Sequence, residues 1–234
     1  MKNCGLYIHI PFCEQKCFYC SFVIAVGQEH RMEEYAESLC AEMLVYRGVD
    51  IQTVYLGGGT PGFLKPEQLK KIFDCIHRHF SLHPQAEVTL EANPQDLDST
   101  KANIIFDLGV NRLSIGAQSF PDDKLRYLGR KHTAQDILDA FDRARKAGIN
   151  NISLDLMYGF PNQTMSELEK DVNAITSLGA EHISLYTLTI EHNSRFFTKN
   201  LQLPDSEIQV EQYAFVKEFM EKKGYAQYEV SNFS

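Results

Sequence analysis

Three of the chain's six cysteines lie within one short stretch, Cys13-Glu14-Gln15-Lys16-Cys17-Phe18-Tyr19-Cys20, which follows an apolar run at Leu6–Ile10. The C-x3-C-x2-C spacing is too tight for ordinary disulfide bridges and suits three thiolates that converge on one metal cluster. Three thiolates on one loop can bind three irons of a cubane and leave the fourth iron without a protein ligand. We therefore predict that Cys13, Cys17 and Cys20 hold a 4Fe-4S cluster with one open iron.

The motif also has to be weighed against zinc. Ferredoxin clusters use four cysteines, and structural zinc sites use four ligands in two separated pairs. Cys4 precedes the first predicted strand and is expected at its far end, while His9 falls within that strand. Neither position suits a fourth ligand, so the spacing favours an iron–sulfur cluster over zinc.

An open iron on a cubane is what radical S-adenosylmethionine chemistry requires. The methionyl amine and carboxylate chelate that iron, and an electron from the reduced cluster breaks a sulfonium C–S bond. The cofactor carries the difficult chemistry, whereas the protein orients it and excludes water. The motif thus predicts S-adenosylmethionine as a second cofactor.

Short β-rich segments alternate with longer amphipathic stretches along the whole chain. The predicted strands are Leu6–Ile10, Thr53–Leu56, Glu87–Glu91, Arg112–Gly116, Asn151–Leu156, His182–Ile190 and Gln227–Val230. The predicted helices include Met32–Tyr46, Pro66–Phe80, Ala134–Ala147, Met165–Leu178 and Glu207–Lys223. Serial βα units of this kind predict a parallel α/β sheet that is wrapped into a barrel or doubly wound.

The boundaries of these helices carry recognisable signals. Thr164 and Glu167 form a capping box before an apolar-periodic run. Glycines at 109, 148, 179 and 224 each stand where a helix is expected to end and a strand soon follows. Glycine takes the left-handed conformation that closes a helix at little steric cost.

Unusual residues gather where the predicted strands end. The stretches concerned are residues 13–20, 57–61, 91–94, 118–120 and 155–161. Function in parallel α/β folds collects at the carboxyl ends of the strands. We therefore expect one site at this edge of the sheet.

Three of these features have more than one interpretation. Residues 55–62 contain G-x-G-x-x-G, but Pro61 interrupts the turn and no acid follows at the spacing of a dinucleotide site. The glycines either let a small charged ligand approach the backbone or make a tight turn. Glu91 and Asp155 either bind an amine or ribose hydroxyl or cap the following loop. Arg130 either pairs with a carboxylate or is solvated.

Composition limits the remaining classes of function. The chain has 234 residues, a net charge of −8 and no apolar run that could span a bilayer. Its basic clusters sit beside acids within helical patterns, so a nucleic-acid partner is not expected. The N-terminus lacks a secretory signal, which predicts a cytoplasmic protein. The sequence stops just after its last predicted strand, which suggests a fragment of a longer protein.

Taken together, these motifs resemble the family of heme chaperones (HemW) and oxygen-independent coproporphyrinogen III dehydrogenases (HemN). The resemblance spans essentially the whole chain. The residues that carry it are 7–13, 20–22, 57–61, 91–94, 111–120, 128–130, 155–161, 184–186 and 228–233. The fold that the resemblance implies is a partial TIM-like barrel of six βα units, (β/α)6, formed by a radical SAM core domain over residues 1–234.

The resemblance also implies roles for single residues. The cluster ligands would be Cys13, Cys17 and Cys20. The implied S-adenosylmethionine contacts are Tyr7, Tyr19, Gly58, Gly59, Thr60, Glu91, Gln118, Arg130 and Asp155. In that picture Arg130 meets the methionyl carboxylate, and Gln118 with Asp155 takes the ribose hydroxyls.

Two departures separate the relatives. The dehydrogenase has a further cysteine where this chain has Phe22, and it carries a long N-terminal extension. Both departures favour the heme-chaperone branch, which implies heme as a ligand, acceptor hemoproteins as partners, and an electron donor such as a flavodoxin or ferredoxin. The alternative is the dehydrogenase, which decarboxylates porphyrinogen propionates oxidatively. The family's C-terminal domain is expected to be missing from this chain.

Overall fold

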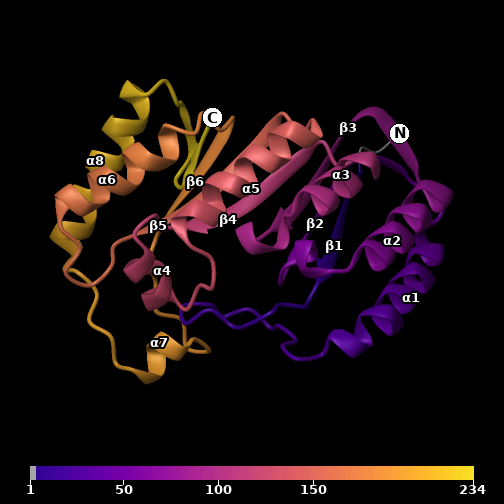
Figure 1. Ribbon diagram of the computed structural model, residues 1–234, viewed down its shortest axis with the longest axis horizontal. Coiled ribbons are helices and arrows are strands. Elements are labelled where there is room, and N and C mark those ends of the chain that lie inside the picture. The colour runs from indigo at the N-terminus through magenta and orange to yellow at the C-terminus, as the bar shows by residue number, and fades with distance from the viewer. Residues whose placement is uncertain (1–3) are drawn as a thin grey trace.

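The computed structural model describes residues 4–234, which form one curved sheet with helices packed on its outer face (Figure 1). The sheet contains eight strands in the order β1-β2-β3-β4-β5-β6-β8-β7. The strands are β1 (Cys4–Ile10), β2 (Asp50–Gly58), β3 (Ser81–Ala92), β4 (Arg112–Gln118), β5 (Asn151–Tyr158), β6 (His182–Thr187), β7 (Gln227–Glu229) and β8 (Asn232–Phe233). Strands β1 to β6 are parallel neighbours, so the expected (β/α)6 partial barrel is confirmed.

Six helices follow the six parallel strands and cover the outside of the barrel. They are α1 (Met32–Met43), α2 (Pro66–His79), α3 (Ser99–Asp107), α5 (Ala134–Ala147), α6 (Met165–Thr176) and α8 (Ser206–Lys222). Two short helices, α4 (Asp122–Leu128) and α7 (Arg195–Thr198), lie in the connections after β4 and β6. Single 3-10 turns occupy Glu29–Arg31, Leu44–Tyr46, Pro61–Phe63 and Pro94–Asp96.

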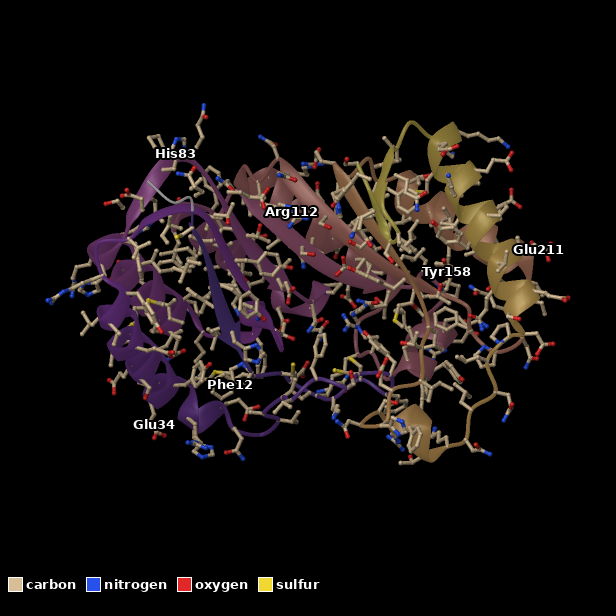
Figure 2. All side chains as sticks on the ribbon, turned by 180° about the vertical axis from the view of Figure 1, so that it is seen from behind. Phe12, Glu34, His83, Arg112, Tyr158 and Glu211 are labelled. Carbon is tan, nitrogen blue, oxygen red and sulfur yellow. The ribbon has the colours of Figure 1, made fainter. Side chains whose placement is uncertain are left out.

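The core lies between the sheet and this helical layer. Alternation along each strand sends apolar side chains outward to the helices, and Leu56, Leu90 and Leu113 are fully buried there. Acidic side chains such as Glu34 on α1 and Glu211 on α8 point away from the molecule at its two ends (Figure 2). The inner face of the strands is left free to carry polar groups, which is where the site forms.

Several predicted boundaries are confirmed by local geometry. Thr164 accepts from the Glu167 backbone N–H and forms the expected capping box of α6. Gly148 closes α5 with a φ of 102°, in the left-handed region. Predicted helix 134–147 coincides with α5, and the other predicted helices end within a few residues of the observed ones.

The predicted last strand, observed as β7, runs in the same direction as β6 but does not pair with it, because β8 lies between the two. The two short strands form a hairpin in which β8 pairs antiparallel with β6, and β7 pairs antiparallel with β8. No helix intervenes between these two short strands, and a parallel pairing needs a long crossover. Short helices α4 and α7 were also not predicted, because each is shorter than the window in which helical periodicity shows.

The cysteine loop leaves β1 at Ile10 and runs across the end of the barrel toward α4 (Figure 1). Hydrogen bonds from Cys13 N to Ala25 O (3.2 Å) and from Ala25 N to Pro11 O (2.8 Å) fold it back on itself. Cys4 begins β1 and so lies at the opposite end of that strand, as expected. Within residues 4–234, no helix combines the length and apolar character needed to cross a membrane.

Candidate functional site

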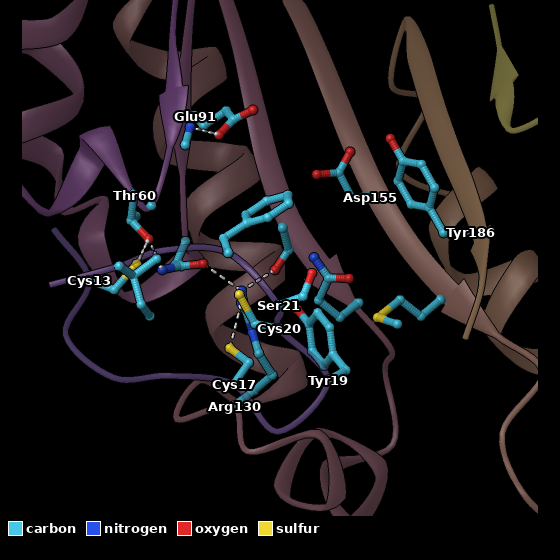
Figure 3. A pocket seen from close by; sticks show the side chains of 18 of the residues that line it. Cys13, Cys17, Tyr19, Cys20, Ser21, Thr60, Glu91, Arg130, Asp155 and Tyr186 are labelled. Atoms are coloured by element: carbon cyan, nitrogen blue, oxygen red, sulfur yellow. Dashed lines mark hydrogen bonds between the residues drawn. The ribbon is translucent and has the colours of Figure 1, made fainter. Parts of the chain in front are cut away.

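A pocket of about 710 Å³ opens at the carboxyl ends of the parallel strands (Figure 3). That volume falls in the range of small-molecule and cofactor sites. The pocket is lined by eleven of the twelve residues predicted for the site: Cys13, Cys17, Tyr19, Cys20, Gly58, Gly59, Thr60, Glu91, Gln118, Arg130 and Asp155. The structure therefore brings together side chains from the cysteine loop and from β2, β3, β4 and β5.

Tyr7 is the predicted site residue that does not line this pocket. It is 58% exposed on the inner face of β1, and its ring stacks on Tyr55 with centroids 6.1 Å apart. Its hydroxyl lies 3.2 Å from Nδ1 of His9. Tyr7 thus sits on the open inner wall beside the pocket.

The three motif thiols sit along one side of the pocket (Figure 3). Cys13 is buried, and its Sγ lies 3.3 Å from Oγ1 of Thr60. Burial raises the pKa of Cys13 to about 11, although the Thr60 hydrogen bond offsets part of that effect. Burial likewise raises the pKa of Cys20. Iron binds the thiolate form of cysteine, so cluster assembly must release the protons that burial favours on Cys13 and Cys20.

The donor set, three thiols from one loop that line the pocket, fits a cubane with one open iron. Within the described residues, no three His, Cys, Asp or Glu side chains converge closely enough to hold one ion. Cluster ligands bind three different irons and therefore lie farther apart than the ligands of one zinc. The remaining cysteines are Cys4 at the far end of β1 and Cys40 and Cys75 in α1 and α2, so none can supply a fourth thiolate.

A continuous hydrogen-bond network joins two of the three thiols. Arg130 donates from one guanidinium nitrogen to Cys17 Sγ (3.5 Å) and from the other to Asn93 Oδ1 (2.6 Å) and Gly116 O (2.6 Å). Asn93 in turn donates to Thr60 Oγ1 (3.2 Å), which contacts Cys13. The network Cys17–Arg130–Asn93–Thr60–Cys13 therefore fixes the two thiols relative to β3 and β4, and it excludes the alternative of a solvated Arg130.

We expect Asn93→Ala to lower the free energy of unfolding by about 1–3 kcal/mol, because it removes a half-buried acceptor of the Arg130 guanidinium. Asn93→Asp, which keeps that acceptor, should lower the free energy of unfolding by a smaller amount. The measurement is urea unfolding of the chain. Gln95→Ala is the matched control, since Gln95 is exposed two residues away and should change stability by less than about 0.5 kcal/mol. An Asn93→Ala value equal to the control would contradict the network's role.

The glycines of residues 57–61 serve the cysteine loop directly. A Cβ on Gly59 would lie 2.8 Å from the backbone of Pro11 and Phe12. Gly59 N and Thr60 N donate to Ile10 O (2.7 Å) and Phe12 O (2.9 Å). Gly58 has a φ of 110° and leaves room for the His9 ring. The glycines therefore let the cysteine loop pack against β2, while both still border the pocket.

Two carboxylates face the inner space across from the thiols. Glu91 accepts from Tyr55 Oη (2.6 Å) and from Gly58 N (3.2 Å), and its pKa is raised chiefly by burial. Burial, followed by the negative charge of Glu91, raises the pKa of Asp155 to about 7. Asp155 lies beside Tyr186 on the far side of the pocket (Figure 3). These are carboxylates poised to accept hydrogen bonds from a bound ligand.

Gln118 ends β4 in a conformation that favours glycine. Its φ is 71°, in the left-handed region, where a side chain costs about 1 kcal/mol or more. The strand register shifts at this point, between Ile115 and Gln118. Such strained backbone clusters at ligand sites, so Gln118 has the geometry of a functional residue.

Sequence reasoning left several pocket residues without a role. Asn93 and Gly116 complete the Arg130 network, and Tyr186 and Met157 line the wall near Asp155. Asn93 and Tyr186 fall in motifs that the family resemblance already marked. Their contacts depend on how β3, β4 and β6 meet, which no single segment reveals.

Comparison with known proteins identifies relatives of the whole chain. Residues 7–175 match the radical SAM superfamily. The chain is 44% identical to heme chaperone HemW of Bacillus subtilis over 239 residues, which cover 97% of this chain and 62% of that protein. HemW of Escherichia coli is 36% identical and is likewise covered over 62% of its length, for 98% of this chain. The chain therefore spans about 62% of the length of these curated relatives.

Solved structures show the same fold. Coproporphyrinogen III oxidase (HemN) from Escherichia coli superimposes with a TM-score of 0.90 at 24% identity, covering 98% of this chain and 55% of that one. The methyltransferase TsrM from Kitasatospora setae superimposes with a TM-score of 0.61 at 16% identity, covering 82% of this chain and 38% of that one. Fold, motif and sequence match agree: the chain belongs to the radical SAM superfamily.

Proposed function

We propose that this chain is the radical S-adenosylmethionine part of a heme chaperone of the HemW type. In this proposal it holds a 4Fe-4S cluster, binds S-adenosylmethionine, and binds heme for transfer to acceptor hemoproteins. The observation that carries the proposal is the set of three pocket-facing thiols with no fourth cysteine within reach. The similarity to proteins named heme chaperone HemW supports the heme part.

Membership of the radical SAM superfamily implies a 4Fe-4S cluster and S-adenosylmethionine. Cys13, Cys17 and Cys20 would hold the cluster, which supplies electron transfer and an open coordination site when bound. Arg130 and Thr60 hydrogen-bond two of the thiols, and such contacts stabilise the thiolate and tune the potential of a bound cluster. The pocket wall around Tyr19, which is half-buried, limits access of water to this side.

The remaining predicted contacts are assigned to S-adenosylmethionine. Asp155 and Gln118 would take the ribose hydroxyls, and the backbone at Gly58, Gly59 and Thr60 borders the methionyl group. Glu91 would accept from the methionyl amine. Arg130 uses three of its five N–H donors within the protein, so two remain for the methionyl carboxylate. Tyr7 would border the ligand from the open inner wall.

Heme rather than porphyrinogen is favoured by the residue two positions after the last motif cysteine. Phe22 stands where the dehydrogenase has a further cysteine, and it is 62% exposed at the pocket edge. All six cysteines are unpaired thiols within the described residues, which fits a reducing compartment such as the cytoplasm. An electron donor such as a flavodoxin or ferredoxin completes the proposal.

Heme titration of the cluster-loaded chain tests this function. We expect saturable heme absorbance at one equivalent per chain, because the HemW-like branch binds heme. The same preparation should produce no vinyl product from coproporphyrinogen III under anaerobic, reducing conditions. Heme uptake that rises linearly without saturation would contradict the chaperone proposal. A vinyl product would show dehydrogenase activity instead.

A further inference from the structure

The outer side of the cysteine loop carries two cations stacked on one aromatic ring. The Arg195 guanidinium carbon lies 4.2 Å from the centroid of the Phe18 ring, and Lys199 Nζ lies 5.3 Å from the same centroid. Phe18 stands between Cys17 and Tyr19 in the motif. Charge at the surface is therefore placed one residue away from a predicted cluster ligand.

The backbone fixes this arrangement from both sides. Phe196 N donates to Phe18 O (2.9 Å), which ties α7 to the loop, and Phe18 N donates to Leu128 O (2.9 Å) at the end of α4. A Cβ on Gly129 would lie 2.7 Å from the Phe18 ring, so that glycine lets the ring lie flat against α4. Figure 1 shows α7 and α4 at the edge that the cysteine loop reaches.

The two segments that meet at Phe18 carry cations and no acidic residue. The protein has a net charge of −8, yet residues 192–204 contain Arg195 and Lys199 and no aspartate or glutamate. Residues 15–28 contain Lys16 and likewise no acid. Arg195, Lys199 and Lys16 are all exposed, and none enters an ion pair within residues 4–234.

A neighbouring lysine is paired with an acidic side chain, whereas Arg195 and Lys199 are not paired within residues 4–234. Lys131, on the same side of the pocket, is paired with Glu14 at 2.7 Å. A cation–π contact stabilises the side chain over the ring and leaves the positive charge available to solvent. The patch formed by Arg195 and Lys199 is thus held in place over the Phe18 ring and forms no ion pair within residues 4–234, which suits an acidic partner.

We propose that this patch is the docking surface for an acidic one-electron carrier protein, which delivers its electron beside Phe18 to the cluster. The inference rests on the proposed cluster at Cys13, Cys17 and Cys20. One electron leaves the reduced carrier and enters the oxidised cluster, and no other reactant is needed. Phe18, Arg195 and Lys199 are not among the residues that line the pocket, so the carrier and S-adenosylmethionine would contact different side chains.

The test compares two double charge reversals on the cluster-loaded chain. Arg195→Glu with Lys199→Glu should lower the second-order rate of cluster reduction by flavodoxin hydroquinone at least about tenfold at low salt. Lys70→Glu with Arg78→Glu on α2 makes the same change in net charge at exposed positions that form no ion pair within residues 4–234, and it should have a much smaller effect. Iron content and reduction by dithionite, which needs no docking, should be the same in both variants.

Salt dependence provides a measurement that needs no variant. Reduction of the unaltered chain by flavodoxin should slow steeply as ionic strength rises, because exposed charges are screened. A salt-independent rate, or equal rates for both double variants, would overturn the docking proposal. The docking proposal would also be overturned if Arg195 and Lys199 were needed to bind single-stranded RNA and flavodoxin did not bind to the chain. Failure of dithionite to reduce any cluster would instead count against the proposed function itself.

Discussion

Cys17→Ala is expected to abolish the cluster and to leave the chain folded. The iron content after anaerobic reconstitution should fall from about four atoms per chain to nearly none, because the two remaining thiolates of the loop cannot hold a cubane. Cys17 lies in the loop after β1, outside every strand and helix, so the barrel should form without it. Iron analysis and circular dichroism of the purified variant measure the two halves of the prediction.

Cys4→Ala is the matched control for this experiment. Cys4 begins β1 at the end of the barrel opposite the loop, where it pairs with Ile51 across the sheet. The substitution removes one thiol, as Cys17→Ala does, but should leave iron at the wild-type level. If Cys17→Ala keeps its iron, the ligand assignment is wrong. If it unfolds, the cluster is structural and the radical-type interpretation is weakened.

The fold could be predicted because its signals are local and repeated. Each βα unit carries its own apolar strand, amphipathic helix and stop signal, such as Thr164 with Glu167 or Gly148. The short strand β8, which lies between β6 and β7, could not be predicted in this way. The pairing of β8 with β6 depends on contacts between residues about fifty positions apart, which the periodicity of Gln227–Val230 does not encode.

In the candidate site, too, residues marked by a local pattern could be predicted, whereas contacts between distant segments could not. The three motif cysteines, Glu91 and Asp155 stood out because each breaks the pattern at the end of an apolar strand, and they line one pocket as expected. The role of Arg130 was harder to predict, since its contacts to Cys17, Asn93 and Gly116 join four separate segments. The glycines were interpreted as room for a ligand, whereas Gly59 first makes room for the cysteine loop.

Asp155 gives the second large prediction, because its ionised carboxylate is expected to bind the ligand and also to destabilise the folded chain. The pKa of Asp155 is raised from 3.8 to about 7 by burial and by Glu91. A carboxyl with a raised pKa in the folded state contributes stability below its unfolded pKa, and that stability is lost as pH rises through the folded value. The chain without ligand should therefore become less stable between about pH 4 and pH 7 on account of this group.

Asp155→Asn should remove this pH dependence. At pH 8 the variant should be more stable than the unaltered chain by several kcal/mol, on the order of 4. Urea unfolding at pH 5 and pH 8 measures the difference. Asp171→Asn is the matched control: Asp171 is also buried, but it accepts from Ser119 Oγ (2.9 Å) and Phe120 N (3.0 Å), so its loss should destabilise the chain.

The same substitution should weaken S-adenosylmethionine binding about tenfold or more, since a carboxylate accepts hydroxyl hydrogen bonds more strongly than an amide oxygen does. Glu91→Gln offers an independent check, because removing the neighbouring negative charge should lower the pKa of Asp155. A stabilised Asp155→Asn variant with unchanged ligand affinity would mean that the carboxylate is not a ligand contact. A gain in stability together with a loss of affinity would mean that the chain keeps a destabilising charge in place because its ligand requires it.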